Sequence, residues 1–119
     1  MPTFNVITNL PKHKIPSTFL SDASKLVSKI LNVPELYIAV NIKAGQQMFW
    51  HDNESLCGLG SLAGTGIYGT EENKYYSSVL YDFLEKELGI PQDRLYISFV
   101  EQNPSNVGIR GTTLQDIIQ

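Results

Sequence analysis

The sequence predicts an α+β domain in which two pseudo-symmetric βαβ units form one four-stranded mixed sheet with two helices on one face. Strand-like and helical hydrophobic patterns follow one another as strand, helix, strand in each half of the chain. The segment LNVPELYIAV from Leu31 recurs in altered form as LGIPQDRLYISFV from Leu88, so each half contains a helix end, a proline turn and a Leu-Tyr-Ile strand. With 119 residues, the chain has the size of a single domain, residues 1–119.

The first unit is predicted from three segments. Residues 3–8 alternate in character from one position to the next and end at a turn-forming Asn-Leu-Pro, which indicates a strand. Apolar residues recur at helical spacing over residues 19–30, and Ser17 or Thr18 stands where a helix cap is expected. Residues 36–42, LYIAVNI, form a nearly continuous apolar run, which is typical of a strand covered on both faces.

The second unit begins in a glycine-rich segment, where residues 56–62 are expected to form a strand. Thr70 is expected to cap a helix whose first turn holds two glutamates, a favourable position for negative charge on the helix dipole. Apolar spacing continues to Leu88, and Gly89 followed by Ile-Pro predicts the helix end. Residues 94–100, RLYISFV, alternate again and predict the last strand.

The sheet face away from the helices is expected to be too apolar to remain in water. We assign Tyr37, Val40, Ile42 and Tyr96 to this face. Large apolar patches are uncommon on monomeric proteins, and another copy of the same chain is the simplest cover. The sequence therefore predicts a closed homo-oligomer.

Composition excludes several classes of function. The net charge is −3 and the basic residues are scattered, which argues against binding to nucleic acid or to an anionic membrane surface. No apolar run approaches the length of about 20 residues that a membrane helix needs, and no signal peptide is recognisable, so we expect synthesis in the cytosol and no membrane insertion. The single Cys57 excludes an internal disulfide and a thiolate metal cage, and is expected to be a small buried hydrophobe. No metal and no cofactor is expected.

Pro2 is the main candidate for chemistry. As a residue without an amide hydrogen, it is permitted at the first position of a strand, and this structural role needs no further function. Alternatively, removal of Met1 turns the Pro2 nitrogen into a secondary amine, whereas in the unprocessed chain that nitrogen is an amide without basicity. An ordinary α-amine has a pKa of about 7.7 to 8.0, a secondary amine is more basic, and burial lowers the value, so the freed amine would be a base near neutrality.

Several short segments in a fixed order point to a family. MPTF, TNLP, YIAV, SLAGTG, QDRLYISF and NPSNVGIRGTTL resemble the macrophage migration inhibitory factor family, which includes D-dopachrome tautomerase, over essentially the whole chain. The resemblance implies a homotrimer whose sheets form a central barrel, with a keto–enol tautomerase site at each subunit interface. The implied base is the freed proline, and the implied substrates are small aromatic 2-oxo acids such as phenylpyruvates, or dopachrome-like molecules. It also implies a protein that is cytoplasmic and is secreted without a signal peptide, as a cytokine-like ligand of a cell-surface receptor.

The resemblance assigns Pro2 as the catalytic residue and five positions to substrate binding. Tyr96 matches the family's pocket tyrosine, which the neighbouring subunit donates, although a barrel-facing aromatic is an equally good structural role. Val33 occupies the place of a lysine that pairs with the substrate carboxylate. Losing that charged contact costs about 1.5 to 3 kcal/mol, which lowers the rate with anionic substrates by about one to two decades. The substrate-binding assignments are Val33, Thr65, Tyr96, Ser98 and Val107.

Other positions depart from the family pattern. Thr65 and Ser98 replace an isoleucine and an asparagine, while Ile109 and Leu114 replace aromatic residues. Arg110 is the alternative source of the missing positive charge, although a solvated surface arginine is the simpler interpretation.

Two further residues look reactive without a partner. Cys57 stands in CGLG, where some family members have Cys-x-x-Cys, so no dithiol redox chemistry is implied. His51, in the loop FWHDNES, has no metal-ligand spacing to the other histidine, His13, and is expected to be an exposed loop residue.

Three functions stay open at this stage. The first is a secreted, cytokine-like protein with weak or altered tautomerase activity, which the presence of Pro2 and Tyr96 favours. The second is a catalytically inactive interaction protein that keeps only the fold, which Val33, Thr65 and Ser98 favour. The third is a metabolic isomerase without a signalling role.

Overall fold

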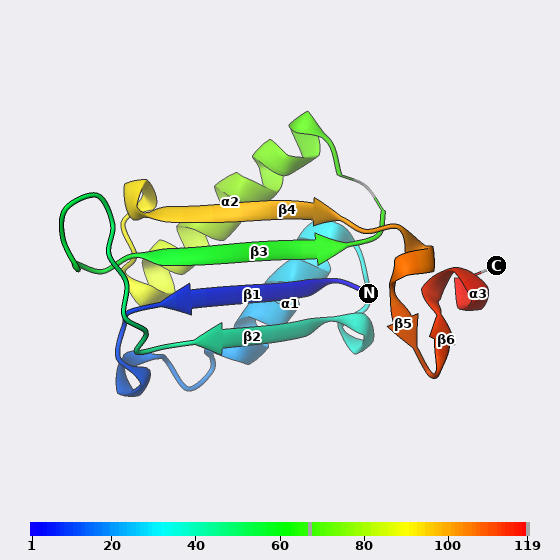
Figure 1. Cartoon of the computed structure of the whole chain (residues 1–119), viewed down its shortest axis with the longest axis horizontal. Coiled ribbons are helices and arrows are strands. Elements are labelled where there is room, and N and C mark those ends of the chain that lie inside the picture. Colours follow the sequence, from blue (N-terminus) through cyan, green and yellow to red (C-terminus); the bar gives the residue numbers. More distant parts are fainter. Residues whose placement is uncertain (67, 119) are drawn as a thin grey trace.

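The sheet and its two covering helices form the body of the molecule in the computed structural model, which describes residues 1–66 and 68–118. Figure 1 shows helices α1 and α2 together behind the sheet, while the opposite face of the sheet is uncovered and turned toward the viewer. This arrangement confirms the α+β class and the single-sided helix layer. The main elements are β1 (Thr3–Thr8), α1 (Phe19–Leu31), β2 (Ala39–Lys43), β3 (Gly58–Gly64), α2 (Thr70–Leu88) and β4 (Leu95–Glu101).

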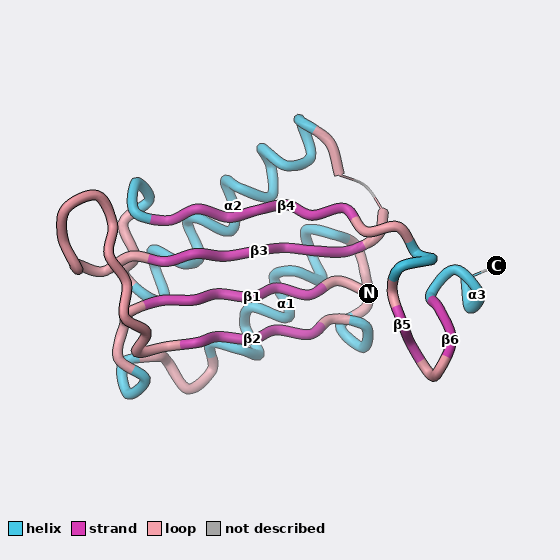
Figure 2. Tube along the Cα trace, viewed as in Figure 1, coloured by secondary structure: helices cyan, strands magenta, loops and turns pink. Residues whose placement is uncertain are grey.

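The strand order β2-β1-β3-β4 follows from two βαβ units joined edge to edge (Figure 2). Strands β1 and β2 are parallel neighbours connected through α1, and β3 and β4 are parallel neighbours connected through α2. The two units meet at β1 and β3, which run antiparallel. The mixed sheet with two pseudo-symmetric halves is therefore confirmed.

The core lies between the helices and one face of the sheet. Phe4 and Val6 of β1 and Leu62 of β3 point toward the helices and are almost completely buried. Each helix ends in a left-handed residue, Asn32 after α1 and Gly89 after α2, as the stop signal at Gly89 predicts. The residues buried in this core are Phe4, Val6, Phe19, Ala23, Val27, Ile30, Leu62, Tyr76, Leu80, Leu84, Leu88, Ile90 and Leu95.

Strand β2 differs from its prediction in length and in orientation. Residues 35–37 form a 3₁₀ turn after Pro34, so the strand begins only at Ala39. Val40 pairs with Phe4, and Ile42 pairs with Val6, which places both side chains on the helix face. Their assignment to the open face was wrong, because paired residues on neighbouring strands point to the same side of a sheet, and Phe4 and Val6 are buried under the helices. As an edge strand, β2 is covered on one face only in the single chain.

The open face nevertheless carries exposed apolar side chains. Tyr96 belongs to this face as predicted and is 68% exposed. Its companions are Ile7, Leu59 and Val100.

Local boundaries differ from the prediction at two further places. Strand β3 begins at Gly58, two residues later than predicted. The backbone of the preceding Cys57 is bonded to side chains and not to a neighbouring strand: Asn9 Oδ1 accepts from its N–H (3.0 Å), and Thr8 Oγ1 donates to its carbonyl (2.7 Å). The N-cap of α2 is Gly69, so Thr70 is its first helical residue and not its cap. The Cys57 side chain is buried and free, as predicted.

The C-terminal segment forms elements that the hydrophobic pattern does not predict. A hairpin of β5 (Gly108–Ile109) and β6 (Thr112–Thr113) precedes a one-turn helix, α3 (Leu114–Ile118). Both turn residues have positive φ, 52° at Arg110 and 78° at Gly111, the requirement of a tight hairpin turn. This segment lies at the end of the sheet that holds the N-terminus (Figure 1). None of the described helices combines the length and the apolar character needed to cross a membrane.

Candidate functional site

Pro2 is buried at the start of β1, and backbone contacts hold it on two sides. Its carbonyl accepts a hydrogen bond from the Ala39 N–H of β2 (3.1 Å). On the other side it lies against Gly64 of β3, where an added Cβ would stand 3.3 Å from Pro2 Cα and 3.3 Å from the Tyr68 hydroxyl. Glycine at this strand end therefore permits the close approach that fixes Pro2.

Two cavities flank the N-terminus. Met1 and Tyr37 line both cavities, so the two adjoin each other at the N-terminus. Burial lowers the pKa of the Met1 α-amino group below its ordinary value of 8.0, which means that this environment disfavours a charged amine. The first cavity, of about 270 Å³, is lined by Met1, Val33, Tyr37, Thr65, Leu114, Ile117 and Ile118. The second, of about 300 Å³, is lined by Met1, Leu36, Tyr37, Ile38, Ala39, Ile109 and Arg110.

Some of the predicted binding residues gather around Pro2. Val33 and Thr65 line the first cavity, and they also line a third cavity together with Pro2 itself. Val107 lines none of these cavities. Its carbonyl accepts a hydrogen bond from the N–H of Leu114 (2.8 Å), and Leu114 lines the first cavity. Three of the predicted positions thus lie at or directly behind one apolar site.

Tyr96 and Ser98 lie elsewhere. Tyr96 stands beside Leu59, which pairs with Ile7, so the tyrosine is level with the far end of β1. Five residues of strand separate that level from Pro2, or about 17 Å along the sheet, with about 10 Å more across two strands. A single chain therefore does not bring Pro2 together with Tyr96.

A contact that the sequence did not indicate holds Tyr96 in place. The ring of Trp50, in the loop between β2 and β3, lies 4.7 Å from the Tyr96 ring, centroid to centroid. Arg94 ties down this loop by donating to the carbonyls of Leu56 and Ser55 and to Asn53 Oδ1, each at 2.9 Å. The only sequence signal is the large aromatic pair FW within a glycine-rich segment.

The charged residues near the site are few. Arg110 is exposed, but it also lines the second cavity, whereas no described lysine or arginine lines the first. The side chain of His51 is 81% exposed and lies 3.8 Å from Asp52, as expected of a loop histidine. Over residues 1–66 and 68–118, the structure contains no group of three or more His, Cys, Asp or Glu side chains that could hold a metal ion.

Comparison with known proteins gives a consistent result. Residues 1–115 match the family model described as macrophage migration inhibitory factor. The chain is similar to the macrophage migration inhibitory factor of Xenopus tropicalis, with 43% identity covering 95% of this chain and 98% of that protein. It is 40% identical to a homologue from Trichuris trichiura, covering 95% and 99% of the two chains. The solved structure of the Trichinella spiralis factor superposes with a TM-score of 0.91 and 39% identity, covering 93% and 98%.

Proposed function

The chain belongs to the macrophage migration inhibitory factor family, and on this premise we propose that it is a homotrimeric keto–enol tautomerase with a cytokine-like role outside the cell. The observation that supports the proposal is the position of Pro2, which is buried at a strand start between backbone contacts, lines one cavity and adjoins a second, more apolar one through Met1. Its substrates are small aromatic 2-oxo acids or dopachrome-like molecules, and its activity is weak or altered because the charge-pairing lysine is absent at Val33.

Catalysis in this proposal uses the nitrogen of Pro2 after removal of Met1. The amine takes the proton from the carbon next to the substrate carbonyl, the C–H electron pair forms the enolate double bond, and the carbonyl oxygen gains the negative charge. Reprotonation on oxygen gives the enol, and the reverse sequence gives the ketone. Burial lowers the pKa of the Met1 α-amine, and we expect the same cause to lower the pKa of the freed Pro2 amine, which favours a neutral base. The backbone amide of Thr65 and the neighbouring subunit's tyrosine are the proposed donors to the developing oxyanion.

The trimer supplies what the single chain lacks. Because Tyr96 and Ser98 stand far from Pro2 on the uncovered sheet face, we propose that they complete the site of an adjacent subunit. Covering that face also removes the apolar side chains of Ile7, Leu59 and Val100 from water. A barrel of three such sheets satisfies both requirements.

Light scattering is expected to give a mass three times the 13.3 kDa of the chain at micromolar concentration. The Leu59→Glu variant should dissociate, since it places a charge on the covered face, and it should lose tautomerase activity because Tyr96 is no longer supplied. Leu20→Glu is the matched control: Leu20 is also a half-exposed leucine, but it lies on α1, and this variant should stay trimeric. A monomeric mass for the unmodified protein contradicts the proposal.

The activity itself is tested with two substrates. Met-free protein, verified by intact mass, is incubated with hydroxyphenylpyruvate and with a dopachrome methyl ester. We expect turnover of both, with the uncharged ester used comparatively better than the free acid. The second candidate is an interaction protein without catalysis, which the apolar replacement at Val33 favours; absence of turnover on both substrates would select it.

The cytokine-like role includes release of the protein from the cytoplasm without a signal peptide and binding to a cell-surface receptor. Family membership is the support for both statements.

A further inference from the structure

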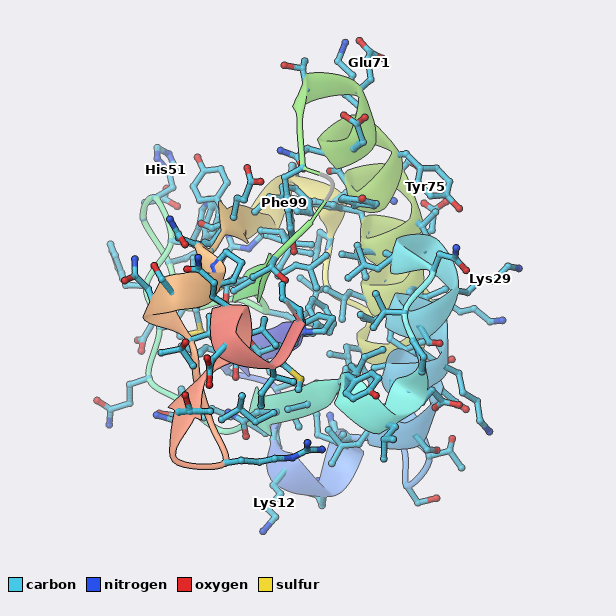
Figure 3. The ribbon with its side chains drawn as sticks, turned by 90° about the vertical axis from the view of Figure 1, so that its right-hand side faces the viewer. Lys12, Lys29, His51, Glu71, Tyr75 and Phe99 are labelled. Carbon is cyan, nitrogen blue, oxygen red and sulfur yellow. The ribbon has the colours of Figure 1, made fainter. Side chains whose placement is uncertain are left out.

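The largest of the cavities that contact the N-terminal segment lies between the end of α1 and the first turns of α2. It measures about 390 Å³ and contacts Pro2 from the helix side. Figure 3 labels Tyr75 on α2, next to the end of α1 from which Lys29 projects. The proposed proton transfer uses none of the α2 side chains in this cavity. Its polar and aromatic lining consists of Asn32, Thr65, Tyr68, Glu72, Tyr75 and Tyr76.

Three phenol rings form one side of the cavity. The Tyr68 and Tyr76 ring centroids lie 5.9 Å apart with an interplanar angle of 74°, and those of Tyr75 and Tyr76 lie 6.1 Å apart at 57°. Rings that meet at such angles present both faces and edges toward a common space, and the negatively polarised faces attract cations. Tyr76 is buried, while Tyr75 is 51% exposed, so the rings extend from the interior to the solvent.

The charges around the cavity are negative. Glu72 is half-buried and has no ion-pair partner among the described residues, whereas its neighbour Glu71 pairs with Lys74 at 3.5 Å. No described lysine or arginine lines the cavity. The C-terminal end of α1, which is the negative end of its helix dipole, also borders the cavity. The positive N-terminal end of α2 is offset by Glu71 and Glu72 in its first turn.

The Tyr68 hydroxyl adds a directional group. Its oxygen is buried and has no hydrogen-bond partner among the described residues. Burial, with Tyr76 and Glu101 nearby, raises the pKa of Tyr68 to about 12, so the phenol stays protonated at neutral pH. A buried hydroxyl without a partner is unfavourable, and an N–H donor bound in the cavity would satisfy its oxygen.

We propose that this cavity binds a small primary ammonium ion with an aromatic or aliphatic tail. The ammonium group lies against the rings of Tyr68, Tyr75 and Tyr76, Glu72 supplies the opposite charge, and the Tyr68 oxygen accepts an N–H. The tail lies on the apolar residues at the end of α1. An anion of the same size would be repelled by Glu72 and by the negative C-terminal end of α1, so the site distinguishes ligands by charge. Pro2, Val33 and Thr65 of the proposed tautomerase site also line this cavity, whereas the proposed ammonium contacts come from Tyr68 and from the α2 side chains.

Calorimetry at neutral pH with phenethylamine as the probe tests this site. We expect saturable binding of phenethylamine and none of phenylacetate, its anionic counterpart. Glu72→Gln should weaken binding at least about tenfold, and Tyr68→Phe should weaken it by a smaller factor while the ring stays in place. A trimethylated analogue has no N–H to donate to the Tyr68 oxygen, so it should bind the unmodified protein more weakly than the primary amine does. The Tyr68→Phe variant, which lacks that oxygen, should bind the two ligands about equally.

The matched control is Glu71→Gln, which changes net charge by the same amount one residue away at an exposed position, and it should bind like the unmodified protein. Three results overturn the proposal: no heat of binding with phenethylamine up to about 10 mM, equal binding of phenylacetate, or equal losses in Glu71→Gln and Glu72→Gln. Circular dichroism of each variant verifies that the fold is retained.

Discussion

Replacing Pro2 with glycine is expected to lower kcat/KM of the Met-free protein by about 10²- to 10⁴-fold on both hydroxyphenylpyruvate and the dopachrome methyl ester, the range of a positioned general base. Glycine still leaves an α-amine at the chain end, but as a mobile primary amine. It has no ring to pack against Gly64, so the nitrogen is no longer held in one direction. Initial rates, followed by the absorbance of the enol or of the dopachrome chromophore, measure the effect.

The matched control is Pro91→Gly, a proline lost from the turn before β4, away from the N-terminus. It is expected to retain the rates of the unmodified protein. Protein that keeps Met1 should be as inactive as Pro2→Gly, since its Pro2 nitrogen is an amide. A Pro2→Gly rate within about a factor of two of the unmodified rate would place the base elsewhere.

The same amine determines the sign of the pH dependence. Burial lowers the pKa of the Met1 α-amine in the unprocessed chain, and we expect burial to lower the pKa of the freed Pro2 amine as well, so that its neutral, proton-accepting form persists to lower pH. As pH falls through the lowered pKa, the amine becomes protonated and kcat/KM declines. The acid limb of the profile is therefore expected at lower pH than an unburied N-terminal proline would give.

The second large effect is expected from Val33→Lys, which should raise kcat/KM for the free acid about ten- to a hundredfold and leave the ester almost unchanged. Position 33 lines the cavity next to Met1 and Thr65, where no described basic residue is present. Val33 is only half-buried, so a lysine there can keep its ammonium group hydrated while it reaches a carboxylate. Parallel rate measurements on the acid and the ester isolate the charge effect.

Arg110→Gln distinguishes the other possible source of positive charge. Arg110 lines the second cavity at the hairpin turn and is exposed. We expect the Arg110→Gln variant to keep the ratio of kcat/KM for the free acid to kcat/KM for the ester within about a factor of two of the unmodified protein, as for a solvated arginine. A selective loss of acid turnover would assign the carboxylate contact to Arg110 and contradict the explanation based on Val33.

The internal repeat predicted the topology but misplaced one strand. In both halves a proline is followed by a three-residue 3₁₀ turn, at residues 35–37 and residues 92–94. In the first half that turn contains the Leu-Tyr pair of the repeated letters, whereas in the second half the same letters begin strand β4. Matching letters are therefore not structurally equivalent, and counting from each proline gives the correct alignment. The two alignments differ by two residues, which leaves every side chain on the same face, so the orientation of Val40 and Ile42 follows instead from their pairing with Phe4 and Val6 in β1.

The candidate site was predictable to the extent that it is local to one end of the chain. Pro2, Val33 and Thr65 meet there because β1, the end of α1 and the end of β3 converge at that edge. The one-turn helix α3 was not predictable, since five residues are too few to display helical periodicity. Nor was the contact of Trp50 with Tyr96, because it depends on how Arg94 folds a loop that has no repeating pattern.

The separation of Pro2 from Tyr96 along the sheet has a genetic consequence. In the proposed trimer each chain serves two sites, giving its proline to one and its tyrosine to another. Two inactive alleles, one altered at Pro2 and one at Tyr96, would then complement each other, because a mixed trimer contains an interface where both intact residues meet. An allele altered at both positions would instead be dominant, since a single altered copy in a trimer disables two of its three sites.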